Sequence, residues 1–241
     1  MFIEYLFDKY IKYFVLYYKF DIRYNLISRY IFEEKLFLSS LINILKLELG
    51  DSFNQPINLP QSLEELTLGF EFNQPIDLPQ SLKELRLGCN FNQSIDLPQS
   101  LKKLTLGDNF NQTLNLSQSL EELTLGTHFD QLIDLPQSLK VLNLGYKFNQ
   151  SINLPQSLKV LELGENFNQP IDLPQSLKVL KLGWKFNKPM DLPQSLKVLN
   201  LGNRYFRRIT LPQSLKVLYL YKEQEKLIKN INQNIIIYYH D

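Results

Sequence analysis

All nine glycines of the chain lie at one fixed spacing, from Gly50 and Gly69 through to Gly202, without an insertion. The stretch FNQPIDLPQSLKELRLG at residues 72–88 has near copies directly before and after it. A short fixed period of this kind is the signature of a solenoid, in which each repeat is one structural unit stacked on the next. One repeat cannot bury its own leucines, so the copies must pack against one another.

Apolar residues keep fixed positions within each repeat. The first full copy has Phe53, Ile57, Leu59, Leu63, Leu66 and Leu68, and the last three are leucine in all nine copies. Leu66-Thr67-Leu68 alternates as a strand with one buried face does. The pattern therefore predicts a short strand at residues 65–68 and its equivalents, joined into a parallel β-sheet with strands ~4.8 Å apart.

Three other recurring positions of the repeat predict its turns and its connecting arm. Gly69 follows the strand, where we expect a positive φ that disfavours a side chain. Pro60 lacks an N–H and holds Leu59 extended, which favours an irregular extended arm over a helix on the convex side. A column of asparagines, including Asn73 and Asn92, predicts a ladder of amides that bond the turn backbone of neighbouring repeats.

Composition limits the classes of function. A formal charge of +1 over 241 residues shows no overall preference for nucleic acid or membrane surfaces. No uncharged run approaches the ~20 residues of a membrane span, and no secretory cleavage pattern is present. Cys89 is the only cysteine, so no intramolecular disulfide can form. These features predict an intracellular, cytoplasmic location.

The repeated motif FNQPIxLPxSLKxLxLG, read from about residue 44 to 220, resembles the FNIP repeat of amoebal and giant-virus proteins. Its SLKxLxLG core after a Leu-Pro pair also resembles leucine-rich repeats. The resemblance implies a leucine-rich-repeat-like solenoid and a role in protein interaction, without catalytic residues. Many members of the family carry an N-terminal F-box, which links a ubiquitin ligase to its target.

The two ends of the chain lack the repeat. Residues 1–43 are rich in aromatic and aliphatic side chains and predict a helical N-terminal cap on a solenoid of residues 44–220. The alternative is a diverged F-box, although the Leu-Pro pair that usually opens an F-box is missing. Residues 221–241 predict a C-terminal cap made of a short helix or strand.

Residue types that carry chemistry are sparse. His128 and His240 have no carboxylate or cysteine at metal-ligand spacing, and Cys89 has no histidine partner in its repeat. We therefore predict no catalytic, metal or cofactor-binding residues, no small-molecule substrate and no enzymatic activity.

Variable positions are the candidates for recognition. Residues 51–126 hold 4 basic and 10 acidic groups (−6), whereas residues 127–220 hold 12 and 6 (+6). Lysine fills one column five times in succession, and two large aromatics occupy a nearby variable column, so the candidate partner-binding residues are Lys140, Lys159, Lys178, Lys197, Lys216, Tyr146 and Trp184. They predict an exposed surface for an acidic protein partner. The alternative is a merely soluble surface copied by duplication.

The unbroken period predicts that whole repeats can be removed. Deleting residues 90–108, one full period, should leave a folded protein because the flanking strands can still stack in register. Deleting residues 90–99 should disrupt the fold, because it shifts every later leucine out of its column. Circular dichroism and limited proteolysis measure both outcomes, and equal damage from the two deletions would contradict the solenoid.

Overall fold

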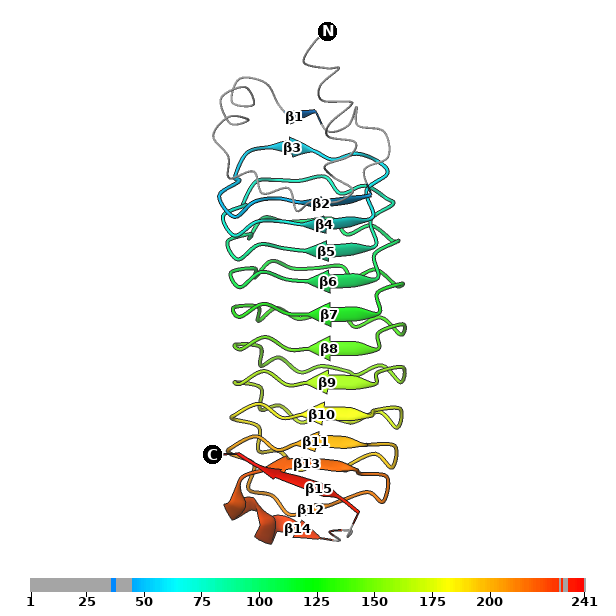
Figure 1. The fold of residues 1–241 in the computed structure, drawn as a ribbon, viewed down its shortest axis with the longest axis vertical. Coiled ribbons are helices and arrows are strands. Elements are labelled where there is room, and N and C mark those ends of the chain that lie inside the picture. Colours follow the sequence, from blue (N-terminus) through cyan, green and yellow to red (C-terminus); the bar gives the residue numbers. More distant parts are fainter. Residues whose placement is uncertain (1–35, 38–44, 230, 232–233, 241) are drawn as a thin grey trace. The chain divides into compact units, whose positions relative to one another are not determined.

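The computed structural model describes residues 36–37, 45–229, 231 and 234–240, the first pair by backbone alone. The described residues fall into two compact units, divided between Ser117 and Gln118. Both are parallel β-solenoids of the leucine-rich-repeat type, with about ten turns in all. Each turn, or rung, is one copy of the sequence repeat (Figure 1).

The described residues of the first unit form six short strands. They are β1 (Leu36–Phe37), β2 (Lys46–Glu48), β3 (Ile57–Asn58), β4 (Glu65–Thr67), β5 (Glu84–Arg86) and β6 (Lys103–Thr105). Strands β2, β4, β5 and β6 pair in this order, all parallel, and each residue lies beside its equivalent in the next repeat. Strand β1 pairs with β3 in a separate two-stranded sheet.

The second unit repeats this arrangement. Its strands are β7 (Glu122–Thr124), β8 (Val141–Asn143), β9 (Val160–Glu162), β10 (Val179–Lys181), β11 (Val198–Asn200), β12 (Ile209–Thr210), β13 (Val217–Leu220), β14 (Ile228–Lys229) and β15 (Ile236–Tyr239). The main sheet runs β7-β8-β9-β10-β11-β13-β15, all parallel. Strands β12 and β14 form a small second sheet. The predicted strand at 65–68 is thus confirmed, one residue shorter at its end.

The invariant leucines form the core. Those of the three columns are 0–7% exposed, because the alternation of the strand turns them inward. The Leu-Pro arms, as predicted, contain no helix among residues 45–221. A β-turn begins at the proline of each Leu-Pro pair, and Leu63 N–H donates to the Pro60 carbonyl at 3.2 Å.

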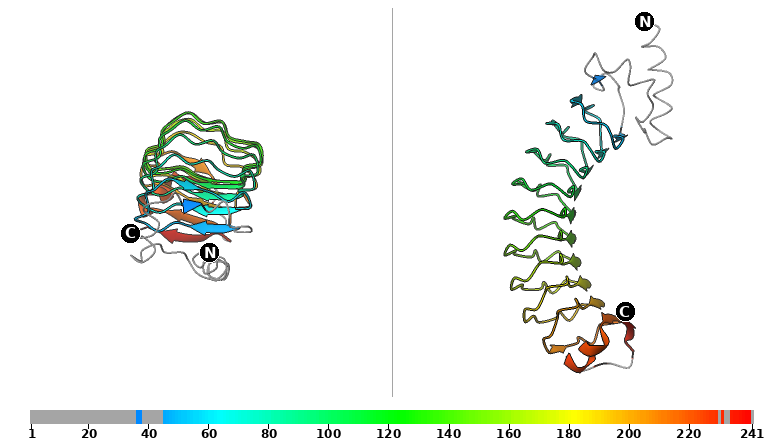
Figure 2. Two further views of the ribbon diagram at one scale, coloured as in Figure 1. Left: turned by 90° about the horizontal axis from the view of Figure 1, so that it is seen from above. Right: turned by 90° about the vertical axis from the view of Figure 1, so that its left-hand side faces the viewer.

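Phenylalanines stack behind the sheet in both units. Neighbouring rings lie 6.1–6.3 Å apart and within 3–11° of parallel, from Phe53 through Phe91 in the first unit and from Phe129 to Tyr205 in the second. This spacing exceeds the ~4.8 Å between paired strands. Within each unit, therefore, the rungs splay apart behind the sheet, and the sheet lies on the inner side of the curve. Figure 2 shows the stacked rungs from two directions.

The glycine column has a different cause from the one the sequence predicts. None of the seven glycines with described surroundings has a positive φ. Instead, a Cβ atom built on each would lie 1.8–2.1 Å from the carbonyl oxygen of the glycine in the preceding rung. Such a distance is far below van der Waals contact. The column is glycine because successive rungs approach too closely for any side chain.

The asparagine ladder is confirmed. Asn54 Oδ1 accepts the backbone N–H of Asn73 at 2.9 Å, and the same bond recurs from rung to rung in both units. Asp130 takes the place of asparagine once and accepts the N–H of Asn149 at 2.9 Å. Backbone donors that would otherwise be unsatisfied in each turn thus gain a partner.

Serine forms a second ladder that sequence reasoning missed. The hydroxyl of Ser157 donates to the carbonyl of Leu139 in the preceding rung at 2.6 Å. The same contact is made within the first unit by Ser81 and Ser100, and within the second by Ser138, Ser176, Ser195 and Ser214. The serine stands three residues before a glutamate in some copies, which suggests a helix cap by sequence alone. Its position in every copy of the repeat was the better signal.

The helical N-terminal cap is not supported. Residues 1–35 and 38–44 lie outside the described residues, and so does most of the alternative F-box. The described pair of that segment, Leu36–Phe37, is strand β1. It pairs with β3 in parallel, with Leu36 beside Ile57 and Phe37 beside Asn58.

At the C-terminal end, a 3-10 helix, η3 (Lys222–Leu227), interrupts the rungs. Gln224 stands where the earlier rungs place phenylalanine, and its buried amide donates to the carbonyls of Gly202 (2.8 Å) and Tyr205 (3.1 Å). Its own Oε1 accepts the N–H of Tyr221 at 2.9 Å. Strand β15 then rejoins the main sheet beside β13.

Gly164→Ala tests the close approach of the rungs. The new Cβ would lie 1.9 Å from the carbonyl oxygen of Gly145, so the rungs must move apart. We expect the free energy of unfolding to fall by about 1–3 kcal/mol, as for other overpacked sites. Urea denaturation of the full chain measures it, with exposed Ser151→Ala of the same rung as control. Equal stability of the two variants would contradict the contact.

Candidate functional site

The five lysines of the candidate site form one column along the second unit. Each directly precedes a strand, from β8 to β13. The backbone fixes their alignment, because the N–H of Lys159 donates to the carbonyl of Lys140 at 2.8 Å and the bond repeats up to Lys216. Four of the lysines are exposed and Lys178 is half-buried. We call this set the lysine column.

One member of the lysine column is already neutralised. Lys140 Nζ lies 2.5 Å from Glu121 of the preceding rung, an exposed ion pair of little consequence for stability. Lys159, Lys178, Lys197 and Lys216 make no ion pair with any residue that the structure describes. Their like charges repel at the spacing of adjacent rungs, which favours an acidic ligand.

A row of valines lies beside the lysine column on the sheet. These residues begin β8, β9, β10, β11 and β13 and are half-buried, namely Val141, Val160, Val179, Val198 and Val217. The same position is Glu65, Glu84, Lys103 and Glu122 in earlier rungs. Sequence reasoning missed this apolar row, although the change from charged residues to valine at 141 was a visible signal.

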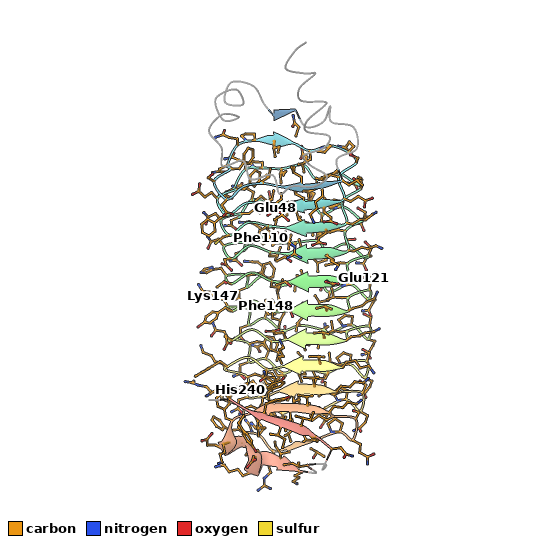
Figure 3. All side chains as sticks on the ribbon, in the orientation of Figure 1. Glu48, Phe110, Glu121, Lys147, Phe148 and His240 are labelled. Atoms are coloured by element: carbon orange, nitrogen blue, oxygen red, sulfur yellow. The ribbon has the colours of Figure 1, made fainter. Side chains whose placement is uncertain are left out.

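The aromatic candidates lie at the other edge of the sheet. Tyr146 and Trp184 follow their strands and are 52% and 45% exposed, so their predicted exposure is confirmed. They are two rungs apart, and Glu165 between them accepts the N–H of Trp184 at 3.0 Å. Figure 3 shows the two edges, with Glu121 on the lysine side and Lys147 on the aromatic side. The structure therefore does not join lysines and aromatics into one cluster.

A further group of aromatic side chains lies at β15, the last strand of the main sheet. Tyr219 stacks on Tyr238 at 5.0 Å, and the His240 ring lies 4.9 Å from that of Tyr221. The His240 ring nitrogen contacts Asn200 Oδ1 at 3.0 Å. Sequence reasoning gave His240 no partner, yet Tyr219 and Tyr238 stand one repeat period apart, and this spacing could have placed the segment in register.

The residues considered for chemistry have surroundings that do not activate them. Burial and the nearby Asp108 carboxylate raise the pKa of the Cys89 thiol, which lowers its fraction of reactive thiolate. His128 lies exposed on a turn. Within the described part of the chain, no three His, Cys, Asp or Glu side chains gather as a metal site would require. No helix described there is long and apolar enough to cross a membrane.

The rungs that build this surface match a known repeat. The family model of the FNIP repeat matches nine overlapping segments that together span residues 42–223. The chain belongs to the FNIP repeat family. Membership agrees with the resemblance read from the sequence, and it covers both units, from strand β2 to the start of η3.

One solved structure is similar to this FNIP chain over most of its length. It is CroV588 of a giant virus, described as a novel circular LRR protein structure, with 36% identity and a TM-score of 0.63. The match covers 80% of this chain but only 36% of CroV588, so this chain spans little more than a third of that protein. A leucine-rich-repeat protein from Bacteroides ovatus is 16% identical, over 81% of this chain and 78% of its own, with a TM-score of 0.32. No curated protein matches this FNIP chain.

Tyr205→Phe tests the last aromatic of the FNIP stack. The Tyr205 hydroxyl is buried and finds no hydrogen-bond partner among the described residues, whereas other rungs carry phenylalanine there. We expect the variant to be more stable by about 1 kcal/mol in urea denaturation. Burial raises the pKa of Tyr205 above its ordinary 10.0, so the wild type loses stability as pH rises past that value and the variant loses less. Lower stability of the variant at neutral pH would contradict this account.

Proposed function

We propose that this chain is a non-enzymatic protein–protein interaction module and that its second unit presents the recognition surface. A leucine-rich-repeat-like solenoid is typical of interaction modules, and extended repeat-built surfaces suit this role. The partner we propose is a protein with an acidic segment, bound along the lysine column.

One observation carries this proposal. The sheet places four lysines without ion pairs to described residues on successive rungs, next to a row of half-buried valines. An acidic segment lying along the column would neutralise like charges and cover the valine row together with the aliphatic lysine stems. Tyr146 and Trp184, at the far edge, would supply apolar anchors of the kind that often carry interface energy.

No finding favours the F-box-like adaptor of a ubiquitin ligase as an alternative. That role would fall on residues 1–40, and the family match begins only at residue 42. The repeat region by itself gives a binding surface and does not indicate a link to a ligase.

Charge reversal tests the lysine column. Changing Lys159, Lys178 and Lys197 to glutamate should slow association with the partner more than it speeds dissociation, because exposed charges act chiefly on encounter. The wild-type on-rate should also fall as salt rises, since such charges are screened over ~8–10 Å at physiological ionic strength. Trp184→Ala should mainly raise the off-rate. Surface plasmon resonance, against the partner found by affinity capture and mass spectrometry, measures both rates.

The matched control reverses three lysines elsewhere in the second unit, Lys147, Lys222 and Lys226, for an identical change of net charge. The proposal requires the lysine-column variant to lose more on-rate than this control. Equal on-rates for both variants, over a range of salt concentrations, would contradict a recognition role for the lysine column. The lysines would then be only a soluble surface copied with the repeat.

A further inference from the structure

Five basic side chains gather on two neighbouring turns of the second unit, on the opposite edge of the sheet from the lysine column. The turn after β10 carries Lys185 and Lys188, and the turn after β11 carries Arg204, Arg207 and Arg208. Four of the five are exposed and Lys188 is half-buried. None makes an ion pair with a described residue. We call these five residues the turn patch.

The two turns are stacked in register. Arg204 N–H donates to the carbonyl of Trp184 at 3.1 Å, and Phe206 N–H donates to Asn187 Oδ1 at 3.1 Å. Beneath them the rings of Phe186 and Tyr205 stack at 6.3 Å. Because equivalent positions of successive repeats lie side by side, this stacking places Lys185 beside Arg204, and Lys188 beside Arg207.

Arg207 is held in place by a bond that the repeat already uses. Its Nε donates to the carbonyl of Asn187 at 3.3 Å. In other rungs a glutamine makes this bond, for example Gln93 to Asn73 at 3.2 Å and Gln150 to Asp130 at 3.2 Å. Arginine at this position thus keeps the ladder and still has two terminal nitrogens for a ligand. Such a fixed guanidinium suits bidentate recognition of a phosphate or carboxylate.

The excess of positive charge ends within one rung on either side of the turn patch. Glu165 lies on the turn of the preceding rung, and η3 in the following rung carries Glu223 and Glu225 together with Lys222 and Lys226, so its charges cancel. A polyanionic chain laid across the turns would meet a carboxylate on one side and no net positive charge on the other. A single compact group with two negative charges matches the patch better than a nucleic-acid backbone does.

Two exposed apolar rings accompany the cations. Trp184 is 45% exposed at the start of the first turn, and Phe206 is 59% exposed on the second. Aromatic rings beside clustered arginines can hold the residues that flank a bound charge. Free inorganic phosphate would leave both rings exposed, whereas a peptide would cover them.

We propose that the turn patch binds a phosphorylated side chain in a protein partner, with Arg207 and its neighbouring cations on the phosphate and Trp184 and Phe206 on flanking apolar residues. Clusters of arginine are a recurring means of reading phosphorylated segments. This inference rests on the proposed interaction function, and it adds a second contact chemistry at the opposite edge of the sheet.

The test uses the full chain and a degenerate peptide library with a central phosphoserine, paired with the same library unphosphorylated. Fluorescence anisotropy should show binding of the phosphorylated library alone, weakening with salt. Lys188→Gln with Arg207→Gln removes two cations and restores the glutamine that other rungs carry, so the ladder bond and the fold remain. We expect this variant to bind at least about tenfold more weakly, the loss of one charge-assisted contact or more.

The control is Lys147→Gln with Lys229→Gln, two exposed lysines outside both the lysine column and the turn patch, which removes the same charge and should leave phosphopeptide affinity near that of the wild type. Equal binding of the unphosphorylated library, equal loss in both double variants, or competition by oligouridylate as strong as by the peptides would overturn the proposal. So would inorganic phosphate binding as tightly as the peptides. Because the lysine-column on-rate is measured separately, each of the two proposals can fail while the other stands.

Discussion

The contact between glycines of successive rungs sets the geometry on which the rest of this structure depends. The carbonyl oxygen of one glycine occupies the space that a Cβ of the next would need, at 1.8–2.1 Å. Rungs this close can stack only if the backbone follows the same course in each of them. An insertion would change that course, which explains why none interrupts the period. Strand pairing, the asparagine and serine ladders and the phenylalanine stack all connect equivalent or nearly equivalent positions of successive repeats. All four kinds of contact therefore require the same register between repeats. A shift of one rung relative to the next would break them together.

Such a scaffold separates stability from recognition. Residues that form the ladders and the core are fixed by contacts with the next rung, while positions that face solvent are free to vary without affecting the stack. Substitutions at these solvent-facing positions line up in columns along the stack. Several residues that favour binding can thus lie side by side on successive rungs. The lysine column precedes the strands and the turn patch follows them, so the second unit carries positive charge along both edges of one sheet. Arg207 shows how a substitution can add charge while keeping the ladder bond of the glutamine it replaces.

Much of the fold could be predicted from the sequence because the period multiplies each weak local signal nine times. Leu66-Thr67-Leu68 alone is a poor indicator of a strand, but nine copies at a fixed spacing indicate a strand in every repeat. The prediction that Gly69 has a positive φ was wrong. The glycine is needed for a contact between rungs, and the local sequence does not reveal such a contact. The serine ladder was missed for the same cause. At the candidate site, the exposure of Tyr146 and Trp184 was predictable from their column, but their separation from the lysines across the sheet required the structure.

At the end of the second unit, a larger residue occupies the glycine position of the repeat. Tyr221 lies one repeat period after Gly202, where its Cβ could not fit against the glycine carbonyl of a normal rung. The chain therefore leaves the path there and enters η3. The side-chain amide of Gln224 then donates to the carbonyls of Gly202 and Tyr205 at 2.8 and 3.1 Å, although the Gly202 carbonyl already accepts the Tyr205 N–H within its own rung. An aromatic residue at 224 would continue the stack but could not donate to either carbonyl. Glutamine in the phenylalanine column thus ends the stacked core, while β15 still extends the sheet by one strand.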